Sequence, residues 1–498
     1  MELLGGFATI ANPHTMLLMI VGTFGGLIVG ALPGLSAFTA LAVMLPFTFG
    51  MDSIDGLCFL VAVYVGGCSG GLISAVLLGI PGTPSSIATC FDGYPMAKKG
   101  QSKTALSAAI ISSFVGGVFG AVVLSFLGPS IARVALKLSI YDYFGIILFA
   151  LCTVSSLAGE NLIKGLISCI LGVCLACVGT DGLSSVYRYT FNITKLSNGF
   201  TLVPVLIGLF AVSQIMGNAR DKADIKALDF SGTDQNSGEK FTFRDYFKRI
   251  RMIVPVSLMG LVVGILPGLG GNVSNLMAYS YAKNTSKTPE KFGTGFVDGI
   301  IASETANNAT VGGAMIILLT LGIPGDNATS VILAGFQMND IAPGPLLFKT
   351  QSKLVYAILA GFVLANVMFF LMEYFGLPIF IKMLSVPSML LLPIVITCCF
   401  VGAYCSGNNT LDILIMVIFG LVGYILKQYR YPLAPMVVGF ILAPMLELYL
   451  RRSLMRTEGA WLPILSSPIA AICIIGTVIL VIFTVRGELK KAKAKAAA

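Results

Sequence analysis

Charged residues are scarce in this sequence. Only 11% of the 498 residues are Asp, Glu, Lys or Arg, against roughly 25% in an ordinary soluble domain, and 56% are hydrophobic. A soluble fold of this composition would leave too much apolar surface in water, so that class is excluded. Apolar runs of about 18 or more residues recur along the chain, as expected of membrane-spanning helices. The composition therefore predicts a polytopic membrane protein.

Histidine is almost absent, which excludes much hydrolytic chemistry. His14 is the one histidine and precedes the first apolar run. No mechanism that needs two histidines is available, and no Ser-His pair is expected. Tyr141 and Asp142 resemble half of an intramembrane aspartyl protease site, but the partner sequence Gly-x-Gly-Asp is missing. An intramembrane hydrolase is thus a weak alternative, and we expect no enzyme.

Cysteine occurs without a metal-binding pattern. The eleven Cys are scattered through apolar segments, where a thiol usually packs as a small hydrophobic group. Cys174 and Cys177 have CxxC spacing, but no second Cys pair or His cluster accompanies them. We expect no metal site and no cofactor other than a coupling ion.

Basic residues give a net charge of +9, yet they lie in short loops between apolar runs. This distribution is typical of cytoplasmic loops of membrane proteins and argues against nucleic-acid binding. The N-terminus lacks a basic region followed by a cleavable apolar core, so we expect no removable signal peptide.

An internal duplication organises the chain. The motif Gly-x-Leu-Pro-Gly-Leu at 30–35 returns at 264–269, and Gly-Ile-Pro-Gly at 79–82 returns at 322–325. Gln-Ser-Lys at 101–103 returns as 351–353. Three matches in the same order indicate two copies of roughly 200 residues.

The repeated Pro-Gly pairs predict interrupted helices. Residues 16–45 are almost wholly apolar and would extend about 45 Å as one helix, well beyond a hydrocarbon core of about 30 Å. Proline removes a backbone donor and clashes with the preceding turn, so we expect a break at Pro33. The fold class is therefore all-α, with about 12 transmembrane helices and broken or re-entrant helical hairpins in two inverted repeats. We divide the chain into a first transmembrane repeat at 1–217, a cytoplasmic linker with an amphipathic segment at 218–251, a second transmembrane repeat at 252–449, and a C-terminal transmembrane helix with a basic tail at 450–498.

Charge differences between the copies support the inversion. The loop after the first element lacks Lys and Arg at 46–55 in copy one but has three Lys at 283–291 in copy two. The loop after the second motif shows the opposite bias, apart from Lys103 and Lys353, which occupy equivalent positions. By the positive-inside rule, the copies insert with opposite orientation, as in many secondary transporters.

Local patterns give three further expectations. Residues 92–100 are predicted to form a polar loop, and Glu373 and Asp142 are placed at membrane interfaces. Residues 241–251 mix aromatic and basic side chains, which is typical of a helix on a membrane surface, although a solvated linker is the alternative.

Helix breaks inside a membrane leave unpaired backbone groups that must face protein, water or a ligand. Helix N-termini favour carboxylates, and carbonyl, Asn, Ser or Asp oxygens suit a small cation. Simple kinking without a ligand is the alternative. The expected substrate-binding residues are Pro33, Gly34, Leu35, Ser36, Gly82, Thr83, Ser85, Ser86, Pro267, Gly268, Gly270, Gly271, Asn272, Gly325, Asn327 and Thr329. The expected ion-coupling residues are Ser274, Asn275, Glu304, Asn307, Asn308 and Asp326.

Glu304 is the main acidic candidate because a carboxyl group within an apolar span is costly and by default functional. A structural pair with a neighbouring helix, or a headgroup position, is the alternative. Copy one has Val61 at the aligned position, so a symmetric pair of carboxylates is not expected.

The motifs together resemble a known family. The repeated Gly-x-Leu-Pro-Gly-Leu, Pro-Gly-Thr-Pro followed by Asp-Gly-Tyr-Pro at 92–95, Glu-x-Ala-x-Asn-Ala from Glu304, Leu-Gly-Ile-Pro-Gly at 321–325 and Pro-Gly-Pro at 343–345 are similar to the large membrane subunit of tripartite tricarboxylate transporters (TctA-type permeases). The resemblance implies a multi-pass permease of a bacterial or archaeal cytoplasmic membrane.

The resemblance also implies partners and a function. The expected partners are a small membrane subunit and an extracytoplasmic solute-binding protein, and the expected function is binding-protein-dependent secondary active import of di- or tricarboxylates, citrate-like by default, with a Na+ or H+ gradient. A passive organic-anion channel is the alternative.

Overall fold

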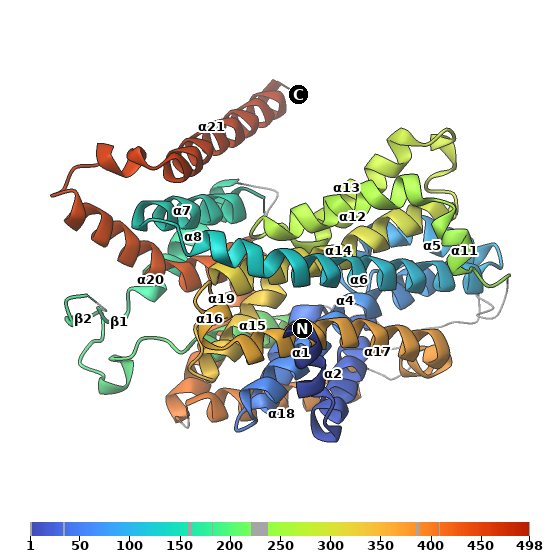
Figure 1. Cartoon of the computed structure of the whole chain (residues 1–498), viewed down its shortest axis with the longest axis horizontal. Coiled ribbons are helices and arrows are strands. Elements are labelled where there is room, and N and C mark those ends of the chain that lie inside the picture. The colour runs from blue at the N-terminus through green and yellow to red at the C-terminus, as the bar shows by residue number, and fades with distance from the viewer. Residues whose placement is uncertain are drawn as a thin grey trace.

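The computed structural model describes residues 2–32, 35–157, 162–181, 183–220, 238–384, 388–407 and 409–497. Most of this chain is helical (Figure 1). The helices up to the linker are α1 (Glu2–Ile10), α2 (Pro13–Ala31), α3 (Ala37–Met44), α4 (Ser53–Leu78), α5 (Ile87–Lys98), α6 (Ser102–Ala135), α7 (Ile140–Leu157), α8 (Leu162–Ala176), α9 (Leu202–Leu206), a π-helical segment (Ile207–Val212) and α10 (Ser213–Arg220). The later helices are α11 (Phe243–Phe247), α12 (Ile250–Ile265), α13 (Gly270–Thr285), α14 (Val297–Leu321), α15 (Asn327–Met338), α16 (Leu347–Thr350), α17 (Ser352–Leu384), α18 (Ser388–Gly407), α19 (Thr410–Gln428), α20 (Leu433–Arg456) and α21 (Pro468–Ala497).

The described helices fit a polytopic membrane protein. Six of them, α2, α4, α6, α17, α19 and α20, are long and apolar enough to cross a membrane, and seven shorter apolar helical segments accompany them. A small antiparallel hairpin joins α8 to α9; it consists of β1 (Gly179–Thr180) and β2 (Tyr187–Arg188), with Gly179 opposite Arg188. The all-α polytopic class is thus confirmed.

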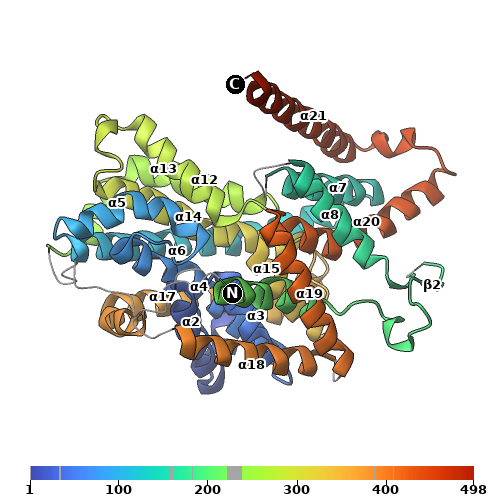
Figure 2. The same cartoon turned by 180° about the vertical axis from the view of Figure 1, so that it is seen from behind.

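The two copies run in opposite directions through the molecule. The basic loop after α5 in copy one meets the basic loop after α13 in copy two, where Lys99 Nζ donates to the Thr294 carbonyl at 2.6 Å. The opposite loops also meet, because Ser53 Oγ donates to Asn339 Oδ1 at 3.1 Å. α5, α11 and α13 therefore lie at one end, and the β1–β2 hairpin lies at the other (Figures 1 and 2). This is the inverted arrangement that the charge pattern predicts.

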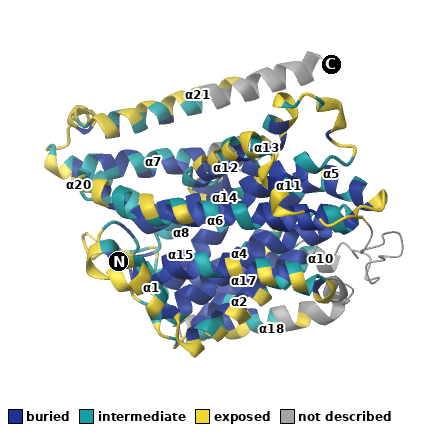
Figure 3. Ribbon diagram, turned by 45° about the vertical axis from the view of Figure 1, so that its right-hand side comes forward, coloured by how far each residue is buried: buried dark blue, intermediate teal, exposed yellow. Residues whose placement is uncertain are grey.

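Two central helices, α4 and α14, occupy equivalent positions in the copies and are buried along most of their length (Figure 3). Each packs against the first helix of its copy through a glycine where the backbones nearly touch. A Cβ on Gly30 would lie 2.3 Å from the Gly67 carbonyl oxygen, and one on Gly264 would lie 2.2 Å from the Thr310 carbonyl oxygen. Small residues permit this close approach, which supplies van der Waals contact where the hydrophobic effect between helices is weak.

Helices stop and restart at all four repeated motifs. In the first element of each copy, α2 ends at Ala31 and α3 begins at Ala37, while α12 ends at Ile265 and α13 begins at Gly270. In the second element, α4 and α14 end at Gly79 and Gly322, with φ of +67° and +73°, a conformation that costs glycine little. Pro33 and Gly34 lie outside the described residues.

The predicted polar loop at 92–100 is wrong, because α5 continues to Lys98. The reason is a contact with the other copy. Asp92 is fully buried, its Oδ1 accepts the backbone N–H groups of Gly293, Gly295 and Phe296 at 2.8–2.9 Å, and its Oδ2 accepts the Tyr279 hydroxyl at 2.8 Å. Asp92 thus holds the loop between α13 and α14 against α5.

Two other predicted surface features, Glu373 and the segment 241–251, pack against helices in the structure. Glu373, predicted at a membrane interface, is completely buried among helices on α17, and its depth in the membrane stays a prediction. In the segment 241–251, the helix α11 has five residues, and Phe241 and Tyr246 are buried. Tyr246 hydrogen-bonds through its hydroxyl to Thr305 of α14, so this part of the linker packs against the helices.

Candidate functional site

Four helix N-termini meet around one central cavity. They are the starts of α3 after Ser36, of the short 3-10 turn Pro84–Ser86 that leads into α5, of α13 at Gly270, and of α15 after Asp326. Because N-terminal N–H groups lack intrahelical partners and carry a partial positive charge, their convergence favours a bound anion.

The cavity has a volume of about 110 Å³, room for several water molecules. Both copies contribute in matched pairs: Ser36 faces it with Gly270, and Tyr64 with Asn307. Its lining comprises Ser36, Ala37, Phe38, Tyr64, Cys68, Thr83, Pro84, Ser85, Gly268, Leu269, Gly270, Gly271, Asn272, Asn307, Thr310, Val311, Asp326, Asn327 and Ala328. These residues include no Lys, Arg or His, and Asp326 carries the one carboxyl group.

The starts of η2 (Pro84–Ser86) and α15 are built alike. Thr83 and Ser86 form a capping box, and so do Asp326 and Thr329, 243 positions later. In a capping box the first side chain accepts from the backbone N–H three residues on, and the later side chain accepts from the first N–H. The copies thus use one local structure, but copy two places a carboxyl group where copy one has a hydroxyl.

Asp326 is held firmly at the cavity wall. Its Oδ1 accepts the Thr329 N–H and hydroxyl, both at 2.8 Å, and its Oδ2 accepts the Tyr64 hydroxyl at 2.5 Å. Tyr64 belongs to α4 of copy one, so this bond joins the two halves across the cavity.

Asn307 has free hydrogen-bonding capacity beside the cavity. The residue is 1% exposed, and neither its amide nitrogen nor its amide oxygen has a hydrogen-bond partner. A Cβ on Gly271 would lie 2.4 Å from Asn307 Oδ1, which shows how closely α13 approaches this side chain. A buried amide without partners is costly unless a ligand or water satisfies it.

Glu304 lies in a separate buried cluster. Its Oε1 accepts the Thr89 hydroxyl at 2.5 Å and its Oε2 accepts the Ser113 hydroxyl at 3.0 Å. The side chain is completely buried and does not line the central cavity, although Asn307, one turn further along α14, does. The two residues therefore connect the cluster to the cavity through one helix.

The structure brings together about half of the predicted residues. Those that line the cavity are Ser36, Thr83, Ser85, Gly268, Gly270, Gly271, Asn272, Asn307, Asp326 and Asn327. Six of the predicted substrate-binding residues do not line the cavity: Leu35, Gly82, Ser86, Pro267, Gly325 and Thr329. Several of them shape the helix breaks; the Gly325 carbonyl, for example, accepts the Gly268 N–H at 2.8 Å. Ser274 bonds to Thr310, Asn275 accepts the Ala88 N–H, and Asn308 donates to the Glu304 carbonyl.

Tyr64, Cys68 and Thr310 line the cavity but were not among the predicted site residues. Tyr64 was hidden inside an apolar run. The internal duplication could have identified it, because position 64 in copy one is equivalent to position 307 in copy two at the offset of 243, and Asn307 is a predicted site residue.

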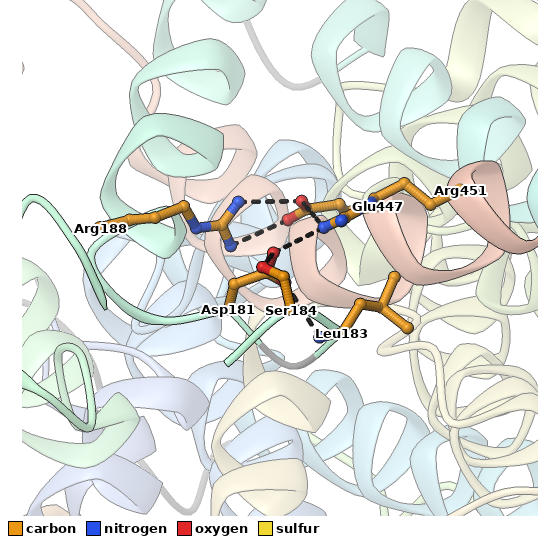
Figure 4. Close-up of polar contacts among 6 residues, drawn as sticks. All are labelled: Asp181, Leu183, Ser184, Arg188, Glu447 and Arg451. Atoms are coloured by element: carbon orange, nitrogen blue, oxygen red, sulfur yellow. Dashed lines mark hydrogen bonds and ion pairs between the residues drawn. The ribbon is translucent and has the colours of Figure 1, made fainter. Parts of the chain in front are cut away.

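A second, larger cavity of about 870 Å³ lies beside the β1–β2 hairpin. Its rim holds an ion-pair network (Figure 4): Arg188 donates to both carboxylate oxygens of Glu447, and Arg451 donates to Glu447 and to Asp181. Hydrogen bonds from Arg451 and Ser184 hold the pKa of Asp181 well below its usual range, and Glu447 raises that of Arg188. The paired charges anchor the hairpin to α20.

Comparison with known proteins identifies the family. The model of the tripartite tricarboxylate transporter TctA family matches residues 16–438. The chain belongs to this family. The resemblance inferred from the motifs is confirmed, and this TctA family protein is a multi-pass membrane protein of a tricarboxylate transporter family.

Two relatives of this TctA family protein come from Agrobacterium vitis. One, described as "Uncharacterized 52.8 kDa protein in TAR-I ttuC' 3'region", is 32% identical over 466 residues, which cover 94% of this chain and 92% of the relative. The other, "Uncharacterized protein in TAR-II ttuC' 3'region", is 34% identical over 212 residues, 43% of this chain and 88% of the relative. No solved structure matches the chain.

Proposed function

We propose that this protein is the permease of a binding-protein-dependent secondary active transporter that imports di- or tricarboxylates, citrate-like in chemistry, together with Na+ or H+. The proposed system includes a small membrane subunit and an extracytoplasmic solute-binding protein, in the cytoplasmic membrane of a bacterium or archaeon. The observation that carries the proposal is the meeting of four helix N-termini and several hydroxyl groups at one cavity between inverted repeats.

The lining chemistry supports a carboxylate ligand. The N–H groups that begin α3, α13 and α15 have no helical carbonyl partners, although Ser36 accepts the Thr39 N–H and Asp326 that of Thr329. The hydroxyls of Ser36, Thr83 and Ser85 lie in the same wall. Hydrogen bonds from such donors to a carboxylate are stronger than bonds between neutral groups. A bound carboxylate would also give the free amide of Asn307 a partner.

The same lining supports coupling to a cation. Asp326 faces the cavity, and no Lys or Arg lies in the described lining to offset a second negative charge. Two like charges in a low-dielectric site repel strongly, so a carboxylate enters at lower cost when Na+ or H+ enters with it. Cation coupling then follows from the charges of the site.

The direct test is uptake of labelled di- and tricarboxylates into proteoliposomes that contain the permease and its small subunit, with the binding protein outside. We expect accumulation above the external concentration under an inward Na+ or H+ gradient. Uptake that only equilibrates would support a passive channel and overturn the proposal.

A pair of serine variants ties transport to the cavity. Ser85→Ala removes a hydroxyl from the lining, whereas Ser112→Ala removes a buried hydroxyl that bonds to the Ala108 carbonyl of its own helix α6. We expect Ser85→Ala to raise the KM for the carboxylate and Ser112→Ala to leave it unchanged. Equal KM values would place the substrate elsewhere.

A further inference from the structure

Glu373 on α17 is a buried acidic residue with one free oxygen. The side chain is completely buried. Its Oε2 accepts the Ser69 hydroxyl of α4 at 3.0 Å, but its Oε1 is buried without any hydrogen-bond partner. A charged carboxylate in this state carries a large desolvation cost, which a bound cation removes.

The packing of α6 against α17 brings Glu373 toward Glu304. The two helices run antiparallel: a Cβ on Gly117 would touch Asn366, and the rings of Phe114 and Phe370 lie 4.6 Å apart. Continuing this register sets Glu373 beside the turn of α6 that precedes Phe114. Ser113 lies in that turn and donates to Glu304, so the two carboxyl groups approach the same part of α6.

The groups around this pair offer hydroxyls but no ion-pair partner. Thr89 of α5, Ser69 of α4 and Ser113 of α6 donate to the two carboxyl groups. The thiols on these elements are Cys68 of α4, next to Ser69 in the chain, and Cys90 of α5, next to Thr89.

One basic group approaches from the linker. The Lys240 ammonium lies 3.9 Å from the ring centroid of Tyr374, next to Glu373 in the chain. No ion pair among the described residues includes Glu304 or Glu373.

The pair is connected to the central cavity by two routes. Ser69 follows Cys68, which lines the cavity, and Glu304 lies one turn before Asn307, which lines it with a free amide. On the other side, Thr89 lies one turn before Asp92, which binds the loop between α13 and α14 at the linker end of the molecule. The pair therefore lies between the cavity and that end.

We propose that Glu373 and Glu304 form one buried acid pair that takes up the coupling proton, with Glu373 Oε1 as the free acceptor. The inference rests on the proposed transport function and names its ion. A proton needs a single free oxygen and no coordination shell, which is what Glu373 offers. The proton enters from water, binds the Glu373 carboxylate so that the pair keeps one negative charge instead of two, and leaves toward the linker end as the cavity empties.

The test uses the complete transport system in proteoliposomes with wild type, Glu373→Gln, and Glu290→Gln as a control on an exposed loop acid. Two assays are compared: accumulation of labelled carboxylate driven by an inward H+ gradient, and carboxylate exchange at equal pH on both sides. We expect Glu373→Gln to lose gradient-driven accumulation at least tenfold while exchange stays within a factor of about two to three, and Glu290→Gln to match wild type.

Several outcomes would overturn the inference. Unchanged proton-driven accumulation by Glu373→Gln would do so, and so would a wild type driven by Na+ with no response to pH. A wild type that exchanges no carboxylate at all would instead defeat the proposed function.

A milder variant covers the case in which Glu373→Gln does not fold. Ser69→Ala keeps the carboxyl group but removes the hydroxyl that stabilises its charged form, so the pair should hold its proton to higher pH. We expect the profile of uptake rate against pH to shift toward higher pH. Ser112→Ala, whose hydroxyl bonds within its own helix, should leave the profile unmoved. A Ser69→Ala profile identical to wild type would count against the pair.

Discussion

Two glycines that flank one helix break, Gly264 and Gly271, should respond very differently to the same substitution. A Cβ on Gly271 would lie 2.4 Å from Asn307 Oδ1 and 2.8 Å from Ser85 Cβ, both side-chain atoms at the cavity. A Cβ on Gly264 would lie 2.2 Å from the Thr310 carbonyl oxygen, which is backbone of α14. Gly271→Ala therefore takes space from the cavity, whereas Gly264→Ala forces two helices apart.

The contact distances give the expected magnitudes. Overpacking against a fixed backbone costs about 1–3 kcal/mol, and replacing a helical Gly by Ala returns up to about 1 kcal/mol, so Gly264→Ala should lower stability by about 1–2 kcal/mol. At Gly271 the Asn307 oxygen is the end of a side chain and can shift, whereas Ser85 Cβ moves only with its backbone, so the free energy of unfolding should fall by about 1 kcal/mol or less, which is a smaller loss than at Gly264. A methyl group in a cavity of about 110 Å³ should instead weaken carboxylate binding at least tenfold, or about 1.4 kcal/mol.

Thermal unfolding of purified protein and the KM for uptake measure the two effects separately. Gly5→Ala is the control, because a Cβ there meets no atom within 4 Å. We expect a lower Tm for Gly264→Ala and a higher KM at near-normal Tm for Gly271→Ala. An unchanged KM for Gly271→Ala would refute the assignment of this cavity to the substrate, and a Tm loss as large as that of Gly264→Ala would refute the packing argument.

Three further predictions follow from single side chains. Tyr64→Phe leaves Asp326 Oδ2 without its hydrogen-bond donor. Because a hydrogen bond to a charged group is worth about 1.5–3 kcal/mol, initial uptake rates should fall tenfold or more. A normal uptake rate would exclude a role for this bond in transport. Asp92→Ala removes the acceptor of three backbone N–H groups and should lower Tm clearly. Asp92→Asn keeps an acceptor oxygen and should lower Tm less. Equal Tm values for the two variants would contradict these hydrogen bonds. Arg451 lowers the folded-state pKa of Asp181. The stabilisation of the fold by the ionised Asp181 is therefore present above the ordinary carboxyl pKa of about 3.9, and it is lost as pH falls through the lower folded-state pKa. Hydrogen exchange of the β1–β2 hairpin should therefore stay slow from pH 7 to about 4 and rise below it, with no such step in Asp181→Asn.

The helix breaks were predictable because their causes are local. Proline removes a donor wherever it occurs, and the duplication shows that each interruption happens twice. The α5 error has a non-local cause: Asp92, Gly93 and Pro95 favour a turn by themselves, but three N–H groups from the other copy bind Asp92 and keep the helix intact. The sequence around Asp92 gives no indication of these N–H donors, because they come from residues 293–296 of copy two.

The depth of a side chain in a membrane protein was harder to predict than its helix. The sequence pattern placed Glu373 at a membrane interface, but α17 continues to Leu384, so Glu373 lies well inside the helix. Its burial also depends on α4 and α6, which pack against it from the other copy. Two of the predicted ion-coupling residues reach the cavity: Asp326 lies at a helix break, and Asn307 lies one turn from Glu304 on α14. Ser274 and Asn275 instead form hydrogen bonds between helices.

The two copies share a fold but divide the charges unequally. Three acids at or near the cavity, the buried Glu304 and Glu373 and the half-buried Asp326, belong to copy two, and the aligned positions of copy one hold uncharged residues: Val61 for Glu304, Thr83 for Asp326 and, at the offset of 250, Val123 for Glu373. Copy one supplies hydroxyl donors to all three acids, through Tyr64, Thr89, Ser69 and Ser113. An anion in the cavity therefore meets hydroxyl groups of copy one, such as Ser36, Thr83 and Ser85, and the Asp326 carboxyl group of copy two. Under the proposed function, a carboxyl group repels the anion until a cation or proton neutralises it, so the asymmetry between the repeats would link the arrival of the cation to that of the substrate.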